Sequence, residues 1–221
     1  MKKPLLLIIW LFTVLHAQAQ VDNYALSFSG NGSVRCGELV QMEHQTSYTF
    51  QFWICPTEWN EGAVIFKSGD SFSACLGTEG SIVFTVGETS LTATAKKQLS
   101  VGNWAQVTLL CNEGAAKVYA NTVKCTSGTL AAIPETGSGL VIGEGFKGRL
   151  DEMRFWKIAL SDEFDYFRHN TSISSIPIGT ILWLITRWIR NFVRTWLTTR
   201  GCIHMTSTII ITARSTAMPK R

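Results

Sequence analysis

The chain has 221 residues, of which 46% are hydrophobic and 16% charged, enough apolar material for a folded domain with a buried core. Its formal charge of +4 is unevenly distributed. Residues 21–165 contain 16 Asp and Glu against 10 Lys and Arg, whereas residues 166–221 contain eight Lys and Arg and no acid. The folded part is therefore acidic, and the basic whole-chain charge does not support nucleic acid as a partner.

Residues 1–20 have the order of a cleavable export signal. Lys2 and Lys3 precede an apolar run from Leu5 to Leu15, and the segment ends in Ala17-Gln18-Ala19-Gln20. Because the apolar run is too short for a membrane-spanning helix, we expect cleavage and no transmembrane anchor. The expected location is secreted, periplasmic or at the cell surface.

Between Val21 and Trp156 the sequence has the rhythm of an antiparallel β-protein. Short β-branched and aromatic runs are broken by Gly, Asn, Ser and Glu roughly every eight to twelve residues. In Tyr48–Ile54 the alternation places Tyr48, Phe50, Phe52 and Ile54 on one face, which predicts a core strand. The predicted strands are Tyr24–Ser29, Tyr48–Ile54, Ala63–Lys67, Phe72–Leu76, Ser81–Val86, Ser90–Ala95, Trp104–Cys111, Ala116–Ala120, Gly139–Gly143 and Arg149–Trp156.

Six cysteines occur without a CxxC pair or the Cys and His spacing of a zinc site. Export permits disulfides, and Cys111 and Cys125 are the candidate pair, facing each other across a hairpin. The alternative for these cysteines is that they are small buried apolar residues.

The most specific segment begins at Gly148 and reads Gly-Arg-Leu-Asp-Glu-Met-Arg-Phe-Trp, followed by Ala159-Leu160-Ser161. With Ala25–Gly30, Tyr48–Ile54 and the pair Asn103-Trp104, it resembles the laminin-G-like, or concanavalin A-like, jelly-roll domains of secreted bacterial proteins. The resemblance implies an all-β fold, a two-sheet antiparallel jelly-roll sandwich over residues 21–170.

Strand alternation predicts the faces of this segment. One face carries Asp151, Met153 and Phe155, and the other carries Leu150, Glu152, Arg154 and Trp156. We predict a structural motif of Asp151, Glu152, Arg154 and Trp156, in which Glu152 pairs with Arg154. The carboxylates of Asp151 and Glu152 should point to opposite faces of the strand. The Glu-x-Asp-x-x-Glu pattern of related glycosidases is absent from the sequence. We therefore predict no catalytic residues and no enzyme activity.

Two kinds of binding site follow from the resemblance. Glycan binding by such folds combines aromatic stacking with polar loop contacts, and Trp59 with Asn60 is the candidate contact; the alternative for Trp59 is packing over the end of the sandwich. Calcium is the candidate cofactor, since oxygen ligands at a sandwich edge suit a hard cation. The candidate ligands, each alternatively an ordinary turn or edge residue, are Asn31, Asp70, Glu144 and Asp151.

Residues 171–221 depart from this pattern, with abundant Thr, Ile, Arg and Trp and no carboxylate. One interpretation is a basic, aromatic helix on a membrane surface over residues 181–196. The interpretation we favour is translation out of frame. Trp has the single codon TGG, so reading one nucleotide earlier joins the last base of the Trp188 codon to the first two bases of the Ile189 codon and gives GAT, which encodes aspartate. In the same frame, allowed codon choices for Leu182 through Arg190 can spell Val-Ala-Tyr-Tyr-Lys-Met-Asp-Gln. We therefore expect a non-native, poorly packed or disordered tail.

The function predicted from the sequence is a non-catalytic secreted module that binds carbohydrate, in a fragment of a longer surface or periplasmic protein. The alternative is a structural or adhesive domain whose partner is a cell-surface protein.

Overall fold

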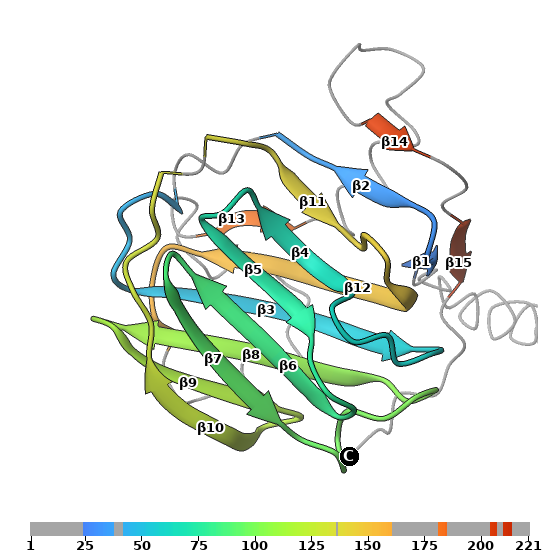
Figure 1. Cartoon of the computed structure of the whole chain (residues 1–221), viewed down its shortest axis with the longest axis horizontal. Coiled ribbons are helices and arrows are strands. Elements are labelled where there is room, and N and C mark those ends of the chain that lie inside the picture. Colours follow the sequence, from blue (N-terminus) through green and yellow to red (C-terminus); the bar gives the residue numbers. More distant parts are fainter. Residues whose placement is uncertain are drawn as a thin grey trace, which may run out of the picture.

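The computed structural model describes residues 24–37, 42–135 and 137–160, together with three short strands nearer the C-terminus (Figure 1). Every regular element in these ranges is a β-strand. The strands are β1 (Tyr24–Ser29), β2 (Ser33–Arg35), β3 (Tyr48–Pro56), β4 (Val64–Ser68), β5 (Phe72–Leu76), β6 (Ser81–Val86), β7 (Thr89–Thr94), β8 (Ala105–Asn112), β9 (Ala115–Ala120), β10 (Val123–Thr129), β11 (Leu140–Ile142), β12 (Lys147–Trp156), β13 (Ile181–Leu184), β14 (His204–Thr206) and β15 (Ile210–Ala213).

The strands form two antiparallel sheets that pack face to face. The back sheet has the order β10-β9-β8-β3-β12-β1-β15, with β13 also paired to β12. The front sheet has the order β14-β2-β11-β4-β5-β6-β7. Figure 1 looks through both layers, with β4, β5, β6 and β7 crossing in front of β3, β8 and β12. This arrangement confirms the two-sheet jelly-roll sandwich.

The core between the sheets is built around the aromatic face of β3. Tyr48, Phe50, Phe52 and Ile54 are each 0% exposed, as the alternation predicted. The Phe50 ring lies 5.4 Å from that of Phe155 in the same sheet; in the front sheet its neighbours are Phe66 at 5.4 Å and Phe72 at 5.2 Å. These rings join the two layers at the centre of the sandwich, where edge-to-face and tilted contacts are favourable.

All ten strands predicted from the sequence are present, with ends that shift by one or two residues. The structure adds β2 and β10 within residues 24–160, and β13, β14 and β15 nearer the C-terminus. Five of the seven residues of β10 are exposed and it includes a glycine, so it lacks the apolar alternation that identifies a strand. It pairs only with β9, as an edge strand does.

The expectations for the two ends fall largely outside the described residues. The export signal at 1–20 lies outside them entirely. Within 171–221 the structure describes β13 paired with β12, β14 paired with β2 and β15 paired with β1. Translation out of frame stays a prediction. No helix among the described residues is long and apolar enough to cross a membrane.

The proposed disulfide between Cys111 and Cys125 is wrong. Both cysteines are free, because β9 lies between β8 and β10 and the neighbour of Cys111 across the sheet is Ala116. Instead, the Cys111 thiol donates to the Thr46 carbonyl and the Cys125 thiol to the Val123 carbonyl. Burial raises the pKa of both thiols, so they are the small apolar residues of the alternative interpretation.

Candidate functional site

A β-bulge interrupts β12 at the two adjacent carboxylates. Asp151 pairs with Trp53 and Arg154 pairs with Gln51, so β12 has one more residue than β3 over this stretch. Glu152 absorbs the extra length with φ +50°, a conformation that non-glycine residues rarely adopt. Leu150 and Met153 both point into the core, on either side of the bulge. Asp151 and Glu152 therefore both lie on the outer face of the back sheet.

The bulge corrects the predicted faces of this segment. Asp151 does not share a face with Met153 and Phe155, and Leu150 does not share one with Arg154, because strict alternation fails where one residue is inserted. The predicted ion pair forms, since the Arg154 guanidinium contacts the Glu152 carboxylate. Nothing in the sequence marks the bulge, because its positive-φ position holds Glu rather than the Gly or Asn that would have signalled it.

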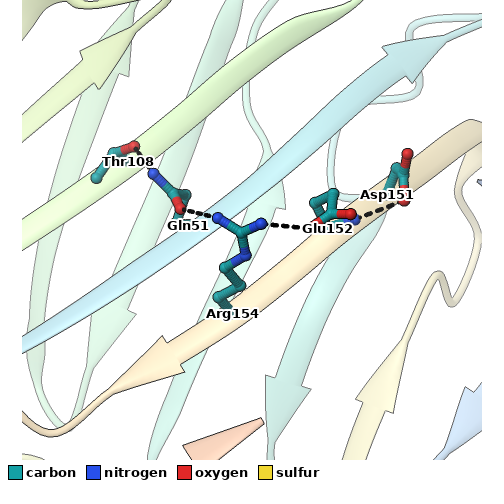
Figure 2. Close-up of polar contacts among 5 residues, drawn as sticks. All are labelled: Gln51, Thr108, Asp151, Glu152 and Arg154. Atoms are coloured by element: carbon teal, nitrogen blue, oxygen red, sulfur yellow. Dashed lines mark hydrogen bonds and ion pairs between the residues drawn. The ribbon is translucent and has the colours of Figure 1, made fainter. Parts of the chain in front are cut away.

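A hydrogen-bonded network extends from the bulge across three strands (Figure 2). Asp151 Oδ1 accepts the backbone N–H of Glu152 at 2.7 Å. Arg154 lies between Glu152 and Gln51, and donates to Gln51 Oε1 at 3.2 Å. Gln51 Nε2 then donates to Thr108 Oγ1 at 3.4 Å. Three side chains of this network are buried: Asp151 is 1%, Gln51 2% and Thr108 3% exposed. Because buried hydrogen bonds are strong, the network holds β12, β3 and β8 together and orients their outer side chains.

Half-buried aromatic side chains lie beside this network. Trp53 is between Asp151 on β12 and Gln106 on β8 in the register of the sheet, and Tyr119 on β9 is the neighbour of Thr108. The outer face of the back sheet thus carries partly exposed rings beside hydrogen-bonding groups that are themselves buried, so the rings are the part of this face that a sugar could stack on. Sequence reasoning missed it, although the polar second face of Tyr48–Ile54 was its visible signal.

A further ring, Trp104, is fixed at the end of this face. The Arg149 guanidinium lies over it, 5.2 Å from the ring centre, and also donates to the Cys55 sulfur at 3.4 Å. A cation held over an indole in this way restrains both side chains.

Trp59 and Asn60, the candidate glycan contacts, lie in the loop between β3 and β4. The Trp59 indole packs against the main core and its Nε1 donates to the Gly77 carbonyl at 3.0 Å. The Asn60 carbonyl accepts the N–H of Ala63 at 3.1 Å. These contacts are those of the packing alternative for Trp59, while both residues keep partly exposed surface.

The candidate calcium ligands do not come together as one set. Asn31 follows β1, Asp70 is in the turn between β4 and β5, Glu144 is in the connection from β11 to β12, and Asp151 is on the back sheet. Glu144 pairs with Lys67 at 2.5 Å. Within the described ranges no three His, Cys, Asp or Glu side chains are grouped as metal ligands. These residues therefore do not fit a shared calcium site, and calcium binding stays a prediction.

Comparison with solved structures shows where else this fold occurs. A protein of Bacteroides ovatus described as a candidate carbohydrate-binding protein has a TM-score of 0.64 at 17% identity, with 87% of this chain and 60% of that chain covered. The heptameric SAP-like pentraxin of Limulus polyphemus has a TM-score of 0.57 at 18% identity, covering 88% and 97%. Domain 4 of AbnA, an extracellular arabinanase of Geobacillus stearothermophilus solved with arabinotriose, has a TM-score of 0.52 at 22% identity, covering 62% and 72%.

At these identities the likeness establishes the fold alone, and the chain spans only 60% of the length of the Bacteroides ovatus protein. No curated protein matches the sequence. Residues 28–163, however, match the family model of the concanavalin A-like lectin/glucanases superfamily, which is more than half of the chain. With the two-sheet sandwich and the closing strand β12, this match is decisive. The chain belongs to the concanavalin A-like lectin/glucanases superfamily.

Proposed function

We propose that this domain is a non-catalytic carbohydrate-binding module that holds a glycan on the outer face of the back sheet. The observation that carries the proposal is Trp53, a partly exposed ring that lies between the buried side chains of Asp151 and Gln106, which are 1% and 5% exposed. A sugar can stack its apolar face on such an aromatic ring, and the buried polar neighbours hold the ring in place rather than contact the sugar. Two of the structural neighbours are described as carbohydrate-binding or solved with a sugar, which supports the proposal.

The bulge contributes rigidity rather than chemistry. Asp151 is tied to the backbone of Glu152, and Glu152 to Arg154, so both carboxylates have structural contacts. A glycosidase requires one carboxyl to give up a proton and the other to act as base or nucleophile, about 5 to 9.5 Å away. The arrangement at the bulge supports a fixed binding surface and no hydrolysis.

The experiment is a glycan array followed by calorimetry with arabinotriose and with each array hit, run on the purified protein with and without EDTA. Trp53→Ala should weaken binding by about tenfold or more, equivalent to about 1.4 kcal/mol, because the stacking ring is lost. Trp53→Phe, which keeps an aromatic ring, should lose less.

Trp59→Ala is the matched comparison, since Trp59 and Asn60 remain a second candidate contact. Equal affinity of Trp53→Ala and the unaltered protein would place the site elsewhere, and a loss confined to Trp59→Ala would assign it to the loop between β3 and β4. Absence of any glycan hit would overturn the proposal and favour the adhesive, protein-binding alternative. Unchanged affinity in EDTA would argue against calcium.

We further propose that the protein acts outside the cytoplasm, on the strength of its first twenty residues. Mass spectrometry of the protein recovered from a secreting host should find an N-terminus near Gln20 or Val21. An intact Met1 in that material would contradict this proposal.

A further inference from the structure

A separate pocket opens on the outer face of the front sheet, opposite to the proposed glycan face. Its volume is about 390 Å³, at the lower end of pockets that hold small molecules. Val141 on β11 forms part of its wall and pairs with Arg35 on β2 and with Lys67 on β4. Because Leu140 and Ile142 point into the core, Val141 and its two cationic neighbours face outward. The register therefore places two positive side chains on opposite sides of the pocket.

The charges around the pocket favour an anion. The Arg35 side chain is exposed and forms no ion pair with any residue that the structure describes. Lys67 pairs with Glu144, but both side chains are more than a third exposed, at 37% and 46%, so this pair is weak and an incoming anion can share the ammonium group. None of the residues that line the pocket is acidic.

Neutral hydrogen-bond donors complete the lining. The Ser138 hydroxyl oxygen is buried and has no hydrogen-bond partner in the described part of the chain, an arrangement that costs free energy until an acceptor arrives. Cys36 also lines the pocket, and burial raises the pKa of its thiol to about 11, so it carries no negative charge at neutral pH. The pocket thus presents two cations and an unused hydroxyl to a ligand.

We propose that this pocket binds the carboxylate of an acidic sugar, a hexuronate unit of a glycan, through Arg35, Lys67 and Ser138. The carboxylate accepts charge-assisted hydrogen bonds from the two cations, which are stronger than neutral ones. Its remaining lone pairs satisfy the Ser138 hydroxyl. The choice of a sugar as the carrier of the carboxylate rests on the proposed carbohydrate-binding function, whereas the anion site itself rests on the pocket alone.

Calorimetry of the full chain with three probes tests this assignment: a trimer of galacturonic acid, the matching neutral galactose trimer, and acetate. The acidic trimer should bind at least about tenfold more tightly than the other two. Arg35→Gln should remove that advantage, and Ser138→Ala should weaken binding severalfold. Lys97→Gln removes one positive charge from an exposed position after β7 and should have no effect. Melting temperatures establish that each variant is folded.

The outcomes separate this inference from the proposed function. Equal binding of the acidic and neutral trimers, or an unchanged affinity in Arg35→Gln, overturns the anion pocket and leaves carbohydrate binding on the back sheet intact. Acetate binding as tightly as the acidic trimer, with both lost in Arg35→Gln, refutes the sugar as the carrier. The inference is supported if Trp53→Ala weakens binding of neutral glycans while the acidic trimer retains its affinity. No binding of the acidic trimer at millimolar concentration overturns it.

Discussion

Glu152 lies at φ +50° in the bulge of β12, where a Cβ atom is unfavourable and glycine is not. Replacing Glu152 by Ala and, separately, by Gly removes the same carboxylate in both proteins. Each variant loses the contact with Arg154, which we estimate at about 1 to 3 kcal/mol. The value is below that of a fully buried pair because the Glu152 side chain is 22% exposed. The difference between the two variants therefore reports on the backbone conformation.

In an ordinary strand Gly is less stable than Ala by about 0.5 to 1 kcal/mol. A residue in the left-handed region carries a penalty of about 1 to 2 kcal/mol when it has a Cβ, and Gly avoids that penalty. At position 152 the usual order should reverse, with Glu152→Gly more stable than Glu152→Ala by about 1 kcal/mol. The contrast does not depend on the value of the lost ion pair, since both variants lose it.

Urea denaturation followed by tryptophan fluorescence measures the free energy of unfolding of each protein. The control is the same pair of substitutions at Thr92, an exposed position in the middle of β7 whose φ is negative. There, Thr92→Ala should be more stable than Thr92→Gly. If Glu152→Gly is no more stable than Glu152→Ala, while the control behaves as expected, the bulge does not impose the conformation described and the reasoning is refuted.

Three further substitutions test the packing and its pH dependence. Phe50→Ala should lower the free energy of unfolding by about 3 to 5 kcal/mol in the same urea titration, and a loss below about 1 kcal/mol would contradict its central position. Gly143→Ala should melt at a clearly lower temperature than Gly145→Ala. Both glycines have positive φ, but only at Gly143 would a Cβ come within 2.1 Å of the Phe28 ring. Equal melting temperatures of the two variants would contradict this clash. Burial raises the pKa of the Cys36 thiol from 9.0 to about 11, so the thiol ionises at lower pH in the unfolded chain than in the folded one, and the free energy of unfolding should fall as the pH rises from 9 to 11. The melting temperature of Cys36→Ala should decline less steeply over this pH range than that of the unaltered protein. An identical decline in both proteins would argue against a buried thiol.

The candidate sites show where sequence reasoning stopped. The Glu152–Arg154 pair was predicted from spacing, and it forms because the two residues remain on one face even with the bulge. Asp151 was assigned to the wrong face, because one inserted residue reverses the alternation on which the assignment depended. The pairing of Cys111 with Cys125 failed for a related reason, since the strand between them was known but β10 was not recognised.

The pocket between Arg35 and Lys67 had no counterpart in the sequence. These residues are 32 positions apart in the numbering and meet only because β11, which follows both in the chain, inserts between β2 and β4. Similarly, Trp53 acquires Gln106 as a neighbour through the pairing of β3 with β8.

The sequence by itself determined the fold class, the core face of Tyr48–Ile54 and the closing segment from Gly148 to Trp156. Apolar alternation and turn residues are local signals, and burial in a two-layer sandwich depends on them directly. Tertiary structure decided the order of strands in each sheet, the bulge at Asp151 and Glu152, and which side chains share a surface. Those features depend on contacts between residues far apart in the chain, where pairing energy and packing, rather than local propensity, select one arrangement.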